Sequence, residues 1–284
     1  MREKRLTLWA PAKLNLSLLV GECRADGYHE IRSVMQKIAL YDTLSFQRSD
    51  SVTFSADLKY LPTDERNLCV RAAKLYFEAT GIRGGVDIRV RKAIPVGAGL
   101  GGGSADAACT LRALQTLYEP MEERALFDLA LRLGADVPFC LSGENTCLCE
   151  GVGEKLTTVS RGQGELYALL VKNERKLSTA AVYGAFDELE HDRTASDEEL
   201  LSALKAGDRE RLCDCLVNQL EDPVFLQKPS LLALCEKMRT AGARGVRMSG
   251  AGPTVYGLFF SAEDAGRAAN AFSDEPFCRV AKFL

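Results

Sequence analysis

The sequence is poor in histidine, in paired cysteine motifs and in excess positive charge, and each scarcity argues against a class of protein. It contains two histidines and no Cys-x-x-Cys pair, so a zinc site is not expected. Its formal net charge is −3, whereas general nucleic-acid-binding proteins carry a basic excess. No apolar run approaches the length of a membrane span, and residues 1–5 lack the apolar core of a signal peptide. We therefore expect a cytoplasmic protein that binds neither nucleic acid nor membranes.

The remaining composition is typical of a globular protein. The 284 residues suffice for one large domain or two modest ones. The ten cysteines are scattered, and most lie within apolar patterns, as Cys109 and Cys140 do, so we interpret them as small buried hydrophobic residues. Two Cys-x-Cys pairs, at positions 147/149 and 213/215, leave a redox role open as the less favoured alternative.

Predicted strands and helices alternate along the chain without long linkers. Apolar alternation predicts strands at residues 43–46, 52–54, 86–90, 166–171, 245–248, 255–260 and 277–283. Helical spacing predicts helices at residues 67–80, 104–118, 122–133, 178–189, 197–205, 208–220, 229–241 and 263–272. A polar, glycine-rich stretch at 160–164 is the predicted boundary. We expect an α+β protein with two domains, residues 1–160 and 161–284.

The most informative stretch is the glycine segment, Pro95 to Ser104, in which five of ten residues are glycine. It follows a predicted strand and precedes a predicted helix, for which Ser104 is a suitable N-cap and Asp106 lies in the first turn. Glycines let backbone N–H groups approach a phosphate, and a helix N-terminus adds partial positive charge. The segment therefore indicates a phosphate-binding loop rather than a flexible linker.

The type of phosphate loop is open from the glycines alone. Gly97, Gly99 and Gly102 match G-x-G-x-x-G, the dinucleotide fingerprint. A strand should follow the first helix of such a unit, whereas a second helix is predicted at 122–133. No lysine follows the last glycine, which excludes a Walker A loop.

Four further stretches have an ordinary and a functional interpretation each. Lys13 and Asn15 share the polar face of a strand, where a lysine is usually solvated. The turn at 24–29 places an aromatic ring beside a histidine, which suits a planar ligand or an ordinary turn equally. Asp136 follows a helix end in an apolar region, where it caps the next short helix or needs another partner. A second glycine-rich turn at 249–252 makes a polyphosphate clamp more probable than either loop would alone.

Three of the stretches described so far together resemble the signature of the galactokinase, homoserine kinase, mevalonate kinase and phosphomevalonate kinase superfamily. They are Pro11-Ala-Lys-Leu-Asn15, the glycine segment and Ser249-Gly-Ala-Gly-Pro253, and they span nearly the whole chain. Within the superfamily the sequence is most similar to the family of 4-diphosphocytidyl-2-C-methyl-D-erythritol kinases. The discriminating stretches are 24–29, the triple glycine 101–103, and 133–138.

The resemblance implies a fold and a reaction. It implies an N-terminal domain like the second domain of ribosomal protein S5, with a left-handed βαβ crossover, and a ferredoxin-like C-terminal domain. The implied reaction is phosphorylation, by ATP with Mg²⁺, of the 2-hydroxyl of cytidine-diphosphate methylerythritol in non-mevalonate isoprenoid synthesis. The partner is thus a small-molecule substrate, and we expect a monomer or weak homodimer.

The resemblance also assigns site residues by position. Lys13 and Asp136 take the places of the catalytic pair. The lysine keeps the carboxylate ionised and orients the nucleophile, and the carboxylate either accepts the hydroxyl proton or only orients the hydroxyl. Tyr28 and His29, with Tyr183, take the places that recognise cytosine. The substrate residues are Asn15, Tyr28, His29, Tyr183, Ser249 and Gly250. The ATP residues are Asn67, Leu68, Lys92, Pro95, Val96, Gly97, Ala98, Gly99, Leu100, Gly101, Gly102, Gly103, Ser104 and Asp106.

One departure from the superfamily pattern concerns the metal. Many members have Ser-Ser-Ala after the glycines, whereas here Ser104 is followed directly by Ala105, which leaves the metal ligands unknown. Three alternatives remain: a mevalonate-type or homoserine kinase, a nicotinamide-dependent oxidoreductase, and a non-catalytic nucleotide-binding module. The first gives Tyr28 and His29 no role. The second needs a strand where a helix is predicted, and the presence of both Lys13 and Asp136 disfavours the third.

Overall fold

The computed structural model describes residues 5–190 and 195–284, which form two compact units. The first unit contains the chain up to Ala12 and residues 40–96 and 101–143. The second contains residues 13–39, 97–100 and 144–284. Two segments that were singled out from the sequence are therefore shared between the units. The first strand passes from the first unit to the second after Ala12. The glycine segment enters the second unit after Val96 and returns to the first after Leu100.

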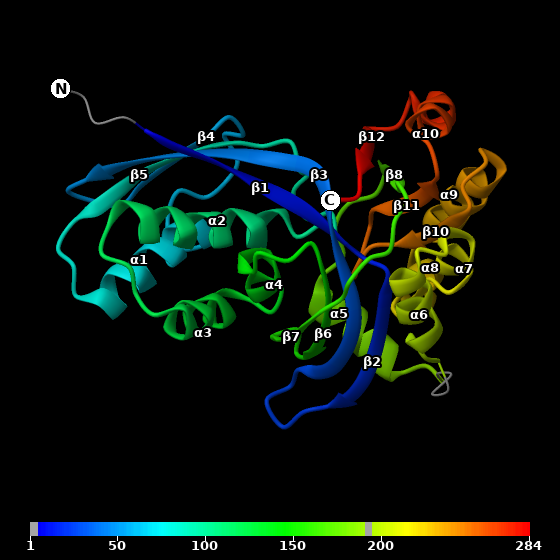
Figure 1. The fold of residues 1–284 in the computed structure, drawn as a ribbon, viewed down its shortest axis with the longest axis horizontal. Helices are drawn as coiled ribbons and strands as arrows, with labels where there is room; N and C mark the ends of the chain where they lie inside the picture. The colour runs from blue at the N-terminus through cyan, green and yellow to red at the C-terminus, as the bar shows by residue number, and fades with distance from the viewer. Residues whose placement is uncertain (1–4, 191–194) are drawn as a thin grey trace. The chain divides into compact units, whose positions relative to one another are not determined.

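The first unit is built on strands that carry helices on one face (Figure 1). Its strands are β1 (Leu6–Asn15), β3 (His29–Ser49), β4 (Thr53–Ala56) and β5 (Gly85–Arg91). The second half of β3 pairs antiparallel with β5, from Thr43↔Arg91 to Ser49↔Gly85. β4 pairs parallel with β5, and the connection between them holds α1 (Leu68–Thr80), which makes a βαβ unit.

The helices of this unit bury a single apolar core. Besides α1 they are α2 (Gly102–Leu117), α3 (Glu123–Leu133) and α4 (Val137–Leu141). Tyr76 and Leu114 pack with Phe46 of β3, all fully buried. Asn67 accepts a hydrogen bond from Cys69 N, and Gly81 adopts a φ of 69° at the C-terminus, so α1 begins and ends where its capping residues predict.

The start of α2 corrects one expectation. Ser104 is not the N-cap, because the helix begins at Gly102 and Gly101 is the N-cap residue with a φ of 69°. Only glycine adopts that left-handed conformation at no steric cost, so the glycine segment itself turns the chain into the helix. Ser104 and Asp106 consequently lie within the first turns of α2.

In the second unit, the first half of β3 pairs antiparallel with β2 (Ser17–Cys23) and with β6 (Thr146–Gly151). β6 continues into a hairpin with β7 (Lys155–Thr158). β2 also pairs in parallel with the short strand β9 (Val217–Asn218). β9 interrupts the helix that was predicted over 208–220, so only α7 (Arg209–Asp214) forms there.

The remainder of this unit is a four-stranded antiparallel sheet in the order β10-β11-β8-β12, with helices packed on it (Figure 1). The strands are β8 (Tyr167–Lys172), β10 (Gly245–Met248), β11 (Val255–Phe259) and β12 (Phe277–Lys282). The helices are α5 (Thr179–Asp187), α6 (Glu198–Ala206), α8 (Glu221–Gln227), α9 (Pro229–Thr240) and α10 (Ala262–Ala269). This sheet order is that of a ferredoxin-like fold, so the predicted α+β class is confirmed.

The cysteines agree with the expectation that most of them are buried. All ten cysteines are free thiols, and six of them are buried. No helix in the described part of the chain is both long and apolar enough to cross a membrane.

Candidate active site

Lys13 is a buried lysine at the end of β1. Its side chain is 4% exposed, and its Nζ donates to Asn15 Oδ1 at 2.8 Å. Asn15 is 2% exposed and Leu14, on the other face of the strand, is fully buried, so both faces of the end of β1 lie inside the protein. The sequence places Lys13 and Asn15 on the polar face of a strand, where a lysine is usually solvated, whereas both are buried.

Both predicted glycine loops reach Lys13 within the second unit. Lys13 N donates to Leu100 O at 3.0 Å, and Ser249 Oγ donates to Gly99 O at 2.9 Å. Gly99 has a φ of 76°, and a Cβ there would lie 2.1 Å from Ser249 O. A Cβ on Gly250 would lie 3.3 Å from Asn15 Oδ1 and 3.8 Å from Lys13 Nζ. The ammonium group, Gly99 and the turn at 249–252 therefore form one cluster.

Buried polar side chains hold the turn at 249–252 in place. Asn218 Nδ2 donates to Met248 O at 2.8 Å and to Gly250 O at 2.9 Å, and its Oδ1 accepts from Leu220 N. Glu221 Oε1 accepts from Met248 N at 2.6 Å. Burial raises the pKa of Glu221 to about 7, although Arg247 acts in the opposite direction. The turn is thus fixed by protein contacts before any ligand binds.

The predicted base-recognition residues form a second group in this unit. The rings of His29 and Tyr183 are stacked, with centroids 5.0 Å apart and planes at 29°. His29 Nε2 lies 2.8 Å from Asp187 Oδ1, and the histidine is 8% exposed. Tyr28 is 62% exposed. His29 thus has a stacked ring, Tyr183, and a carboxylate, Asp187, as partners, and the neighbouring Tyr28 is exposed. Such a group is suited to stacking on a planar base and to hydrogen bonding with its edge.

In the first unit, the start of α2 presents backbone N–H groups of the glycine segment. Gly101 to Ser104 form the N-cap and first turn, and Gly103 approaches Leu68, since a Cβ on it would lie 3.7 Å from Leu68 Cδ1. Pro95 and Val96 precede this turn, and Val96 is 45% exposed. The N-terminus of a helix that starts with glycines is a general anion-binding arrangement.

Lys92 is the centre of a buried ionic cluster in the same unit. Its Nζ donates to Asp42 and, at 2.6 Å, to Asp106 Oδ2. Asp42 Oδ1 also accepts from the backbone N–H groups of Ala93 and Ile94, at 2.6 and 2.9 Å. The cluster therefore joins the chain before the glycine segment to the first turns of α2, and the Lys92 ammonium group is already paired with two carboxylates.

Asp106 carries an unusual charge environment. Burial raises its pKa to about 7; Lys92 opposes this, and the carboxylate of Asp42 adds to it. The physical cause is plain, since two carboxylates share one ammonium group away from water. Asp106 Oδ1 is enclosed and has no hydrogen-bond partner among the described residues.

Two more predicted residues occupy helix starts in the first unit. Asn67 is the N-cap of α1, and its amide also donates to Pro62 O at 2.9 Å. Asp136 is the N-cap residue of α4, where its side chain makes no capping hydrogen bond and Pro138 lies in the first turn. The alternative in which Asp136 merely caps this helix is therefore not what the structure contains.

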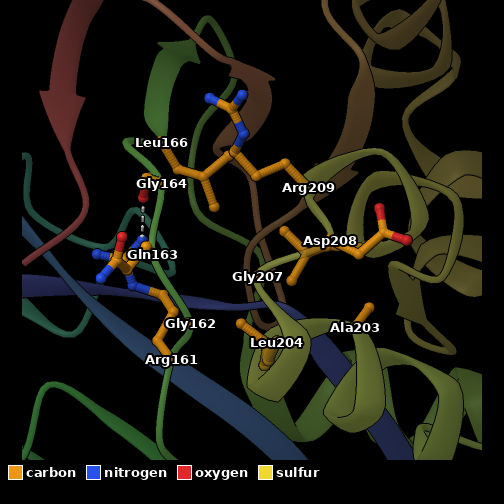
Figure 2. Close-up of a pocket in the computed structure, with 11 residues that line it drawn as sticks. Arg161, Gly162, Gln163, Gly164, Leu166, Ala203, Leu204, Gly207, Asp208 and Arg209 are labelled. Carbon is orange, nitrogen blue, oxygen red and sulfur yellow. Dashed lines mark hydrogen bonds between the residues drawn. The ribbon is translucent and has the colours of Figure 1, made fainter.

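A pocket in the second unit is lined by the segment that precedes β8 and by residues of α6, α7 and the turn between them (Figure 2). Arg161 Nη1 donates to Gly164 O at 2.8 Å along its wall. The enclosed and adjoining open volume is about 200 Å³, and the lining residues are Arg161, Gly162, Gln163, Gly164, Leu166, Ala203, Leu204, Gly207, Asp208, Arg209 and Leu212. None of these belongs to the predicted site.

Sequence reasoning missed several side chains that contact the predicted residues, and three of them show why. Asp42 and Ser33 lie within β3, where a polar residue gives no local signal of its partner. Asp187 ends α5, one helical turn after Tyr183, and that spacing of four was the available signal.

Comparison with known proteins identifies the family. Residues 67–144 match the model of the GHMP kinases N terminal domain, and residues 200–277 match that of the GHMP kinases C terminal domain. The chain is 39% identical over 268 residues to the 4-diphosphocytidyl-2-C-methyl-D-erythritol kinase of Caldicellulosiruptor saccharolyticus, covering 93% of this chain and 92% of that protein. It is 40% identical to the enzyme of that name from Clostridium novyi, over 88% of this chain and 89% of the relative.

Solved structures agree with the sequence matches. A crystal structure of 4-(cytidine 5'-diphospho)-2C-methyl-D-erythritol kinase superposes with a TM-score of 0.82 at 38% identity, covering 98% of this chain and 99% of the other. Homoserine kinase from Cytophaga hutchinsonii shares the fold, with a TM-score of 0.77 at 21% identity over 100% and 96% of the two chains. The chain therefore belongs to the 4-diphosphocytidyl-2-C-methyl-D-erythritol kinase family of the GHMP kinases.

Proposed function

We propose that the protein transfers the γ-phosphoryl group of ATP to the 2-hydroxyl of 4-diphosphocytidyl-2-C-methyl-D-erythritol. The observation that carries this proposal is the similarity to kinases of that name over almost the entire chain. The buried lysine beside two glycine loops supports it, because phosphoryl transfer depends chiefly on positioning and charge neutralisation. The acceptor is a small molecule, and the proposal includes no nucleic-acid or membrane partner.

Lys13 and Asp136 are the catalytic residues of the proposal. Asp136 accepts the proton of the attacking hydroxyl or orients that hydroxyl, and Lys13 provides a cation that favours the ionised carboxylate. Asp136 leads into α4 and makes no capping bond there. Both residues match the superfamily positions, which supports the assignment.

The glycine segment and the turn at 249–252 bind the phosphates in this proposal. The backbone N–H groups of Gly101 to Ser104 are already oriented for binding an anion, because they belong to the N-cap and first turn of α2. Leu68 flanks the nucleotide. Lys92 keeps its place beside ATP, but its ammonium group is held by Asp42 and Asp106, so we propose that it shapes the site rather than contacting adenine through that group.

Magnesium accompanies ATP in the proposal. Among the residues that the structure describes, no group of three or more His, Cys, Asp or Glu side chains could hold a metal ion. Asp106 Oδ2 is bonded to Lys92 and its Oδ1 is enclosed. This donor set fits a Mg²⁺ ion held mainly by phosphate oxygens and water, with the Ser104 hydroxyl as the protein ligand. When bound, the ion would neutralise charge on the phosphate oxygens.

The test is ADP release in the presence of Mg²⁺ and ATP, with and without the cytidine-diphosphate acceptor, with phosphorus NMR of the product. We expect ADP release to require the acceptor and His29→Ala to lose most of it through a higher acceptor KM. Mevalonate and homoserine serve as cytidine-free acceptors. Their turnover, with no loss in His29→Ala, would replace this proposal by another kinase of the superfamily.

A further inference from the structure

Asn15 has both ends of its side-chain amide in use inside the protein. Its Oδ1 accepts from Lys13 Nζ at 2.8 Å, and its Nδ2 donates to Ser33 Oγ at 2.8 Å. Asn15 is 2% exposed, Lys13 is 4% exposed and Ser33 is fully buried. All three belong to the second unit, so the contacts are internal to that unit.

The protons in this chain of bonds allow one arrangement. Ser33 Oγ donates its single proton to Ser17 O at 2.6 Å, so toward Asn15 it can only accept. An ammonium group can only donate, so the Asn15 atom that faces Lys13 must be the oxygen. The two requirements agree, and together they fix the orientation of the Asn15 amide.

The carbonyl that receives the Ser33 proton is itself held. Ser17 Oγ accepts from Val34 N at 2.8 Å and donates to Asp197 Oδ2 at 3.2 Å. Asp197 is 1% exposed and accepts from Arg32 Nε at 2.8 Å. The Ser33 hydroxyl therefore donates to a carbonyl whose residue, Ser17, is itself held by hydrogen bonds. The hydroxyl cannot rotate without breaking a buried hydrogen bond.

We infer that Asn15 is a positioning residue for Lys13, and that Ser33 is the support that orients Asn15. The inference rests on the proposed function, in which Lys13 acts on the reacting groups. It differs from the family expectation that Asn15 contacts the substrate. An ammonium group on a flexible four-carbon stem has little preference for one position, and the bond to Asn15 Oδ1 is one contact that restricts it.

The test is a double-mutant cycle of Ser33→Ala and Asn15→Ala, with kcat and both KM values measured. Asn15→Ala removes the bonds to Lys13 and Ser33, and Ser33→Ala removes those to Asn15 and Ser17. For each single change we expect kcat to fall about tenfold while the KM for the acceptor and for ATP stays within about twofold. Because Ser33 acts through Asn15, the double variant is expected to match Asn15→Ala alone. Ser45→Ala, at a half-buried serine of the same strand, is the control and should keep full kcat.

Three outcomes would overturn the inference. A rise in the acceptor KM of Asn15→Ala with unchanged kcat would make Asn15 a substrate contact. Independent losses that multiply in the double variant would show that Ser33 does not act through Asn15. An unchanged kcat in Ser33→Ala would remove its role altogether. If Ser33→Ala does not fold, Ser33→Thr keeps the hydroxyl and should retain kcat within about threefold, whereas Asn15→Ala alone still decides between kcat and KM.

A failed inference can be told apart from a failed proposed function. Lys13→Met is measured beside the cycle. If Lys13→Met keeps full kcat, the catalytic role of Lys13 is wrong whatever the cycle shows. If it abolishes turnover while the cycle shows no coupling, the catalytic role stands and only the positioning inference falls.

Discussion

A carboxylate that takes part in transferring a hydroxyl proton has to be available to that hydroxyl rather than committed to a helix cap. Asp136 occupies the N-cap position of α4 without a capping hydrogen bond, so its carboxylate is not committed to that helix cap. The α4 backbone instead begins with Pro138 in its first turn, and proline has no N–H to satisfy. With no N–H at residue 138, the first turn of α4 has one backbone donor fewer for the Asp136 side chain to cap.

Replacing this carboxylate tests its role at the residue scale. Asp136→Asn is expected to lower kcat by roughly 10²- to 10⁴-fold, the usual contribution of positioned proton transfer, with small changes in KM. A stopped assay of ADP release measures it, with circular dichroism to show that the fold is retained. Asp128→Asn, at an exposed position of α3, is the matched control and should keep full activity. A loss below about fivefold would leave Asp136 as an orienting group.

Asp106 gives a prediction about stability against pH. Burial raises its folded-state pKa to about 7, above the value of about 3.8 in an unfolded chain. Between these values the folded protein holds a proton that the unfolded chain has released, so the free energy of unfolding falls as pH rises. The stabilising effect is complete below pH of about 4 and lost above about 7.

The comparison with Asp106→Asn isolates that effect, because asparagine does not titrate. The melting temperature of the native protein minus that of Asp106→Asn should decrease steadily from pH 4.5 to 7 and become constant at pH 8. Glu221, whose pKa is also raised to about 7 by burial, titrates in both proteins and cancels in the difference. A difference that does not change with pH would contradict the raised pKa of Asp106.

At the scale of elements, the approach of the two glycine loops depends on one missing side chain. Gly99 has a φ of 76°, and a Cβ there would lie 2.1 Å from Ser249 O. Gly99→Ala is expected to lower the free energy of unfolding by about 1–3 kcal/mol and to reduce kcat, because the turn at 249–252 must move. Urea denaturation and steady-state kinetics measure the two effects.

The control for this change is another glycine of the second unit. Gly266 lies exposed in α10, and a Cβ there would meet nothing within 4 Å. Gly266→Ala should raise the free energy of unfolding by about 0.5–1 kcal/mol, since alanine is the better helix former. If Gly99→Ala behaves like Gly266→Ala, the close packing of the two loops is not present in solution.

The elements that the sequence predicted well are those with local signals at both ends. α1 has Asn67 and Gly81 as caps, and β5 alternates cleanly. β3, at 21 residues, was recognised only in part, because its first half is buried on both faces and so does not alternate. β6 was not predicted at all, since it is formed by pairing with β3, a partner more than a hundred residues away.

The same distinction applies to the candidate site. Backbone-based features, such as the glycine segment and the turn at 249–252, are visible in the sequence because glycine has few other uses in such patterns. Lys13 could be selected only through the family resemblance, since the strand pattern assigned it to solvent. Ser33 and Asp42 could be found neither from the strand pattern nor from the family resemblance. A buried hydrogen bond between residues that are distant in the sequence leaves no trace in local composition.

At the scale of the whole molecule, both compact units contribute segments to the nucleotide-binding residues of the proposal. The glycine segment passes from the first unit into the second at Gly97 and returns at Gly101. Lys13 begins the part of β1 that belongs to the second unit, whereas Asp106 and Asp136 belong to the first. A nucleotide that binds this segment in the folded protein, and not in the unfolded chain, would stabilise the folded state.

This dependence predicts the effect of nucleotides on thermal unfolding. A ligand at about one hundred times its Kd stabilises the native state by about 2.7 kcal/mol, which corresponds to a rise in Tm of about 5–10 °C for a chain of this size. We expect Mg²⁺ with a non-hydrolysable ATP analogue to raise Tm, and the cytidine-diphosphate acceptor to raise it further. NAD should leave Tm unchanged, because a helix, α3, follows α2 where a dinucleotide fold requires a strand. A rise with NAD and none with the ATP analogue would restore the oxidoreductase alternative, and it would do so independently of any rate measurement.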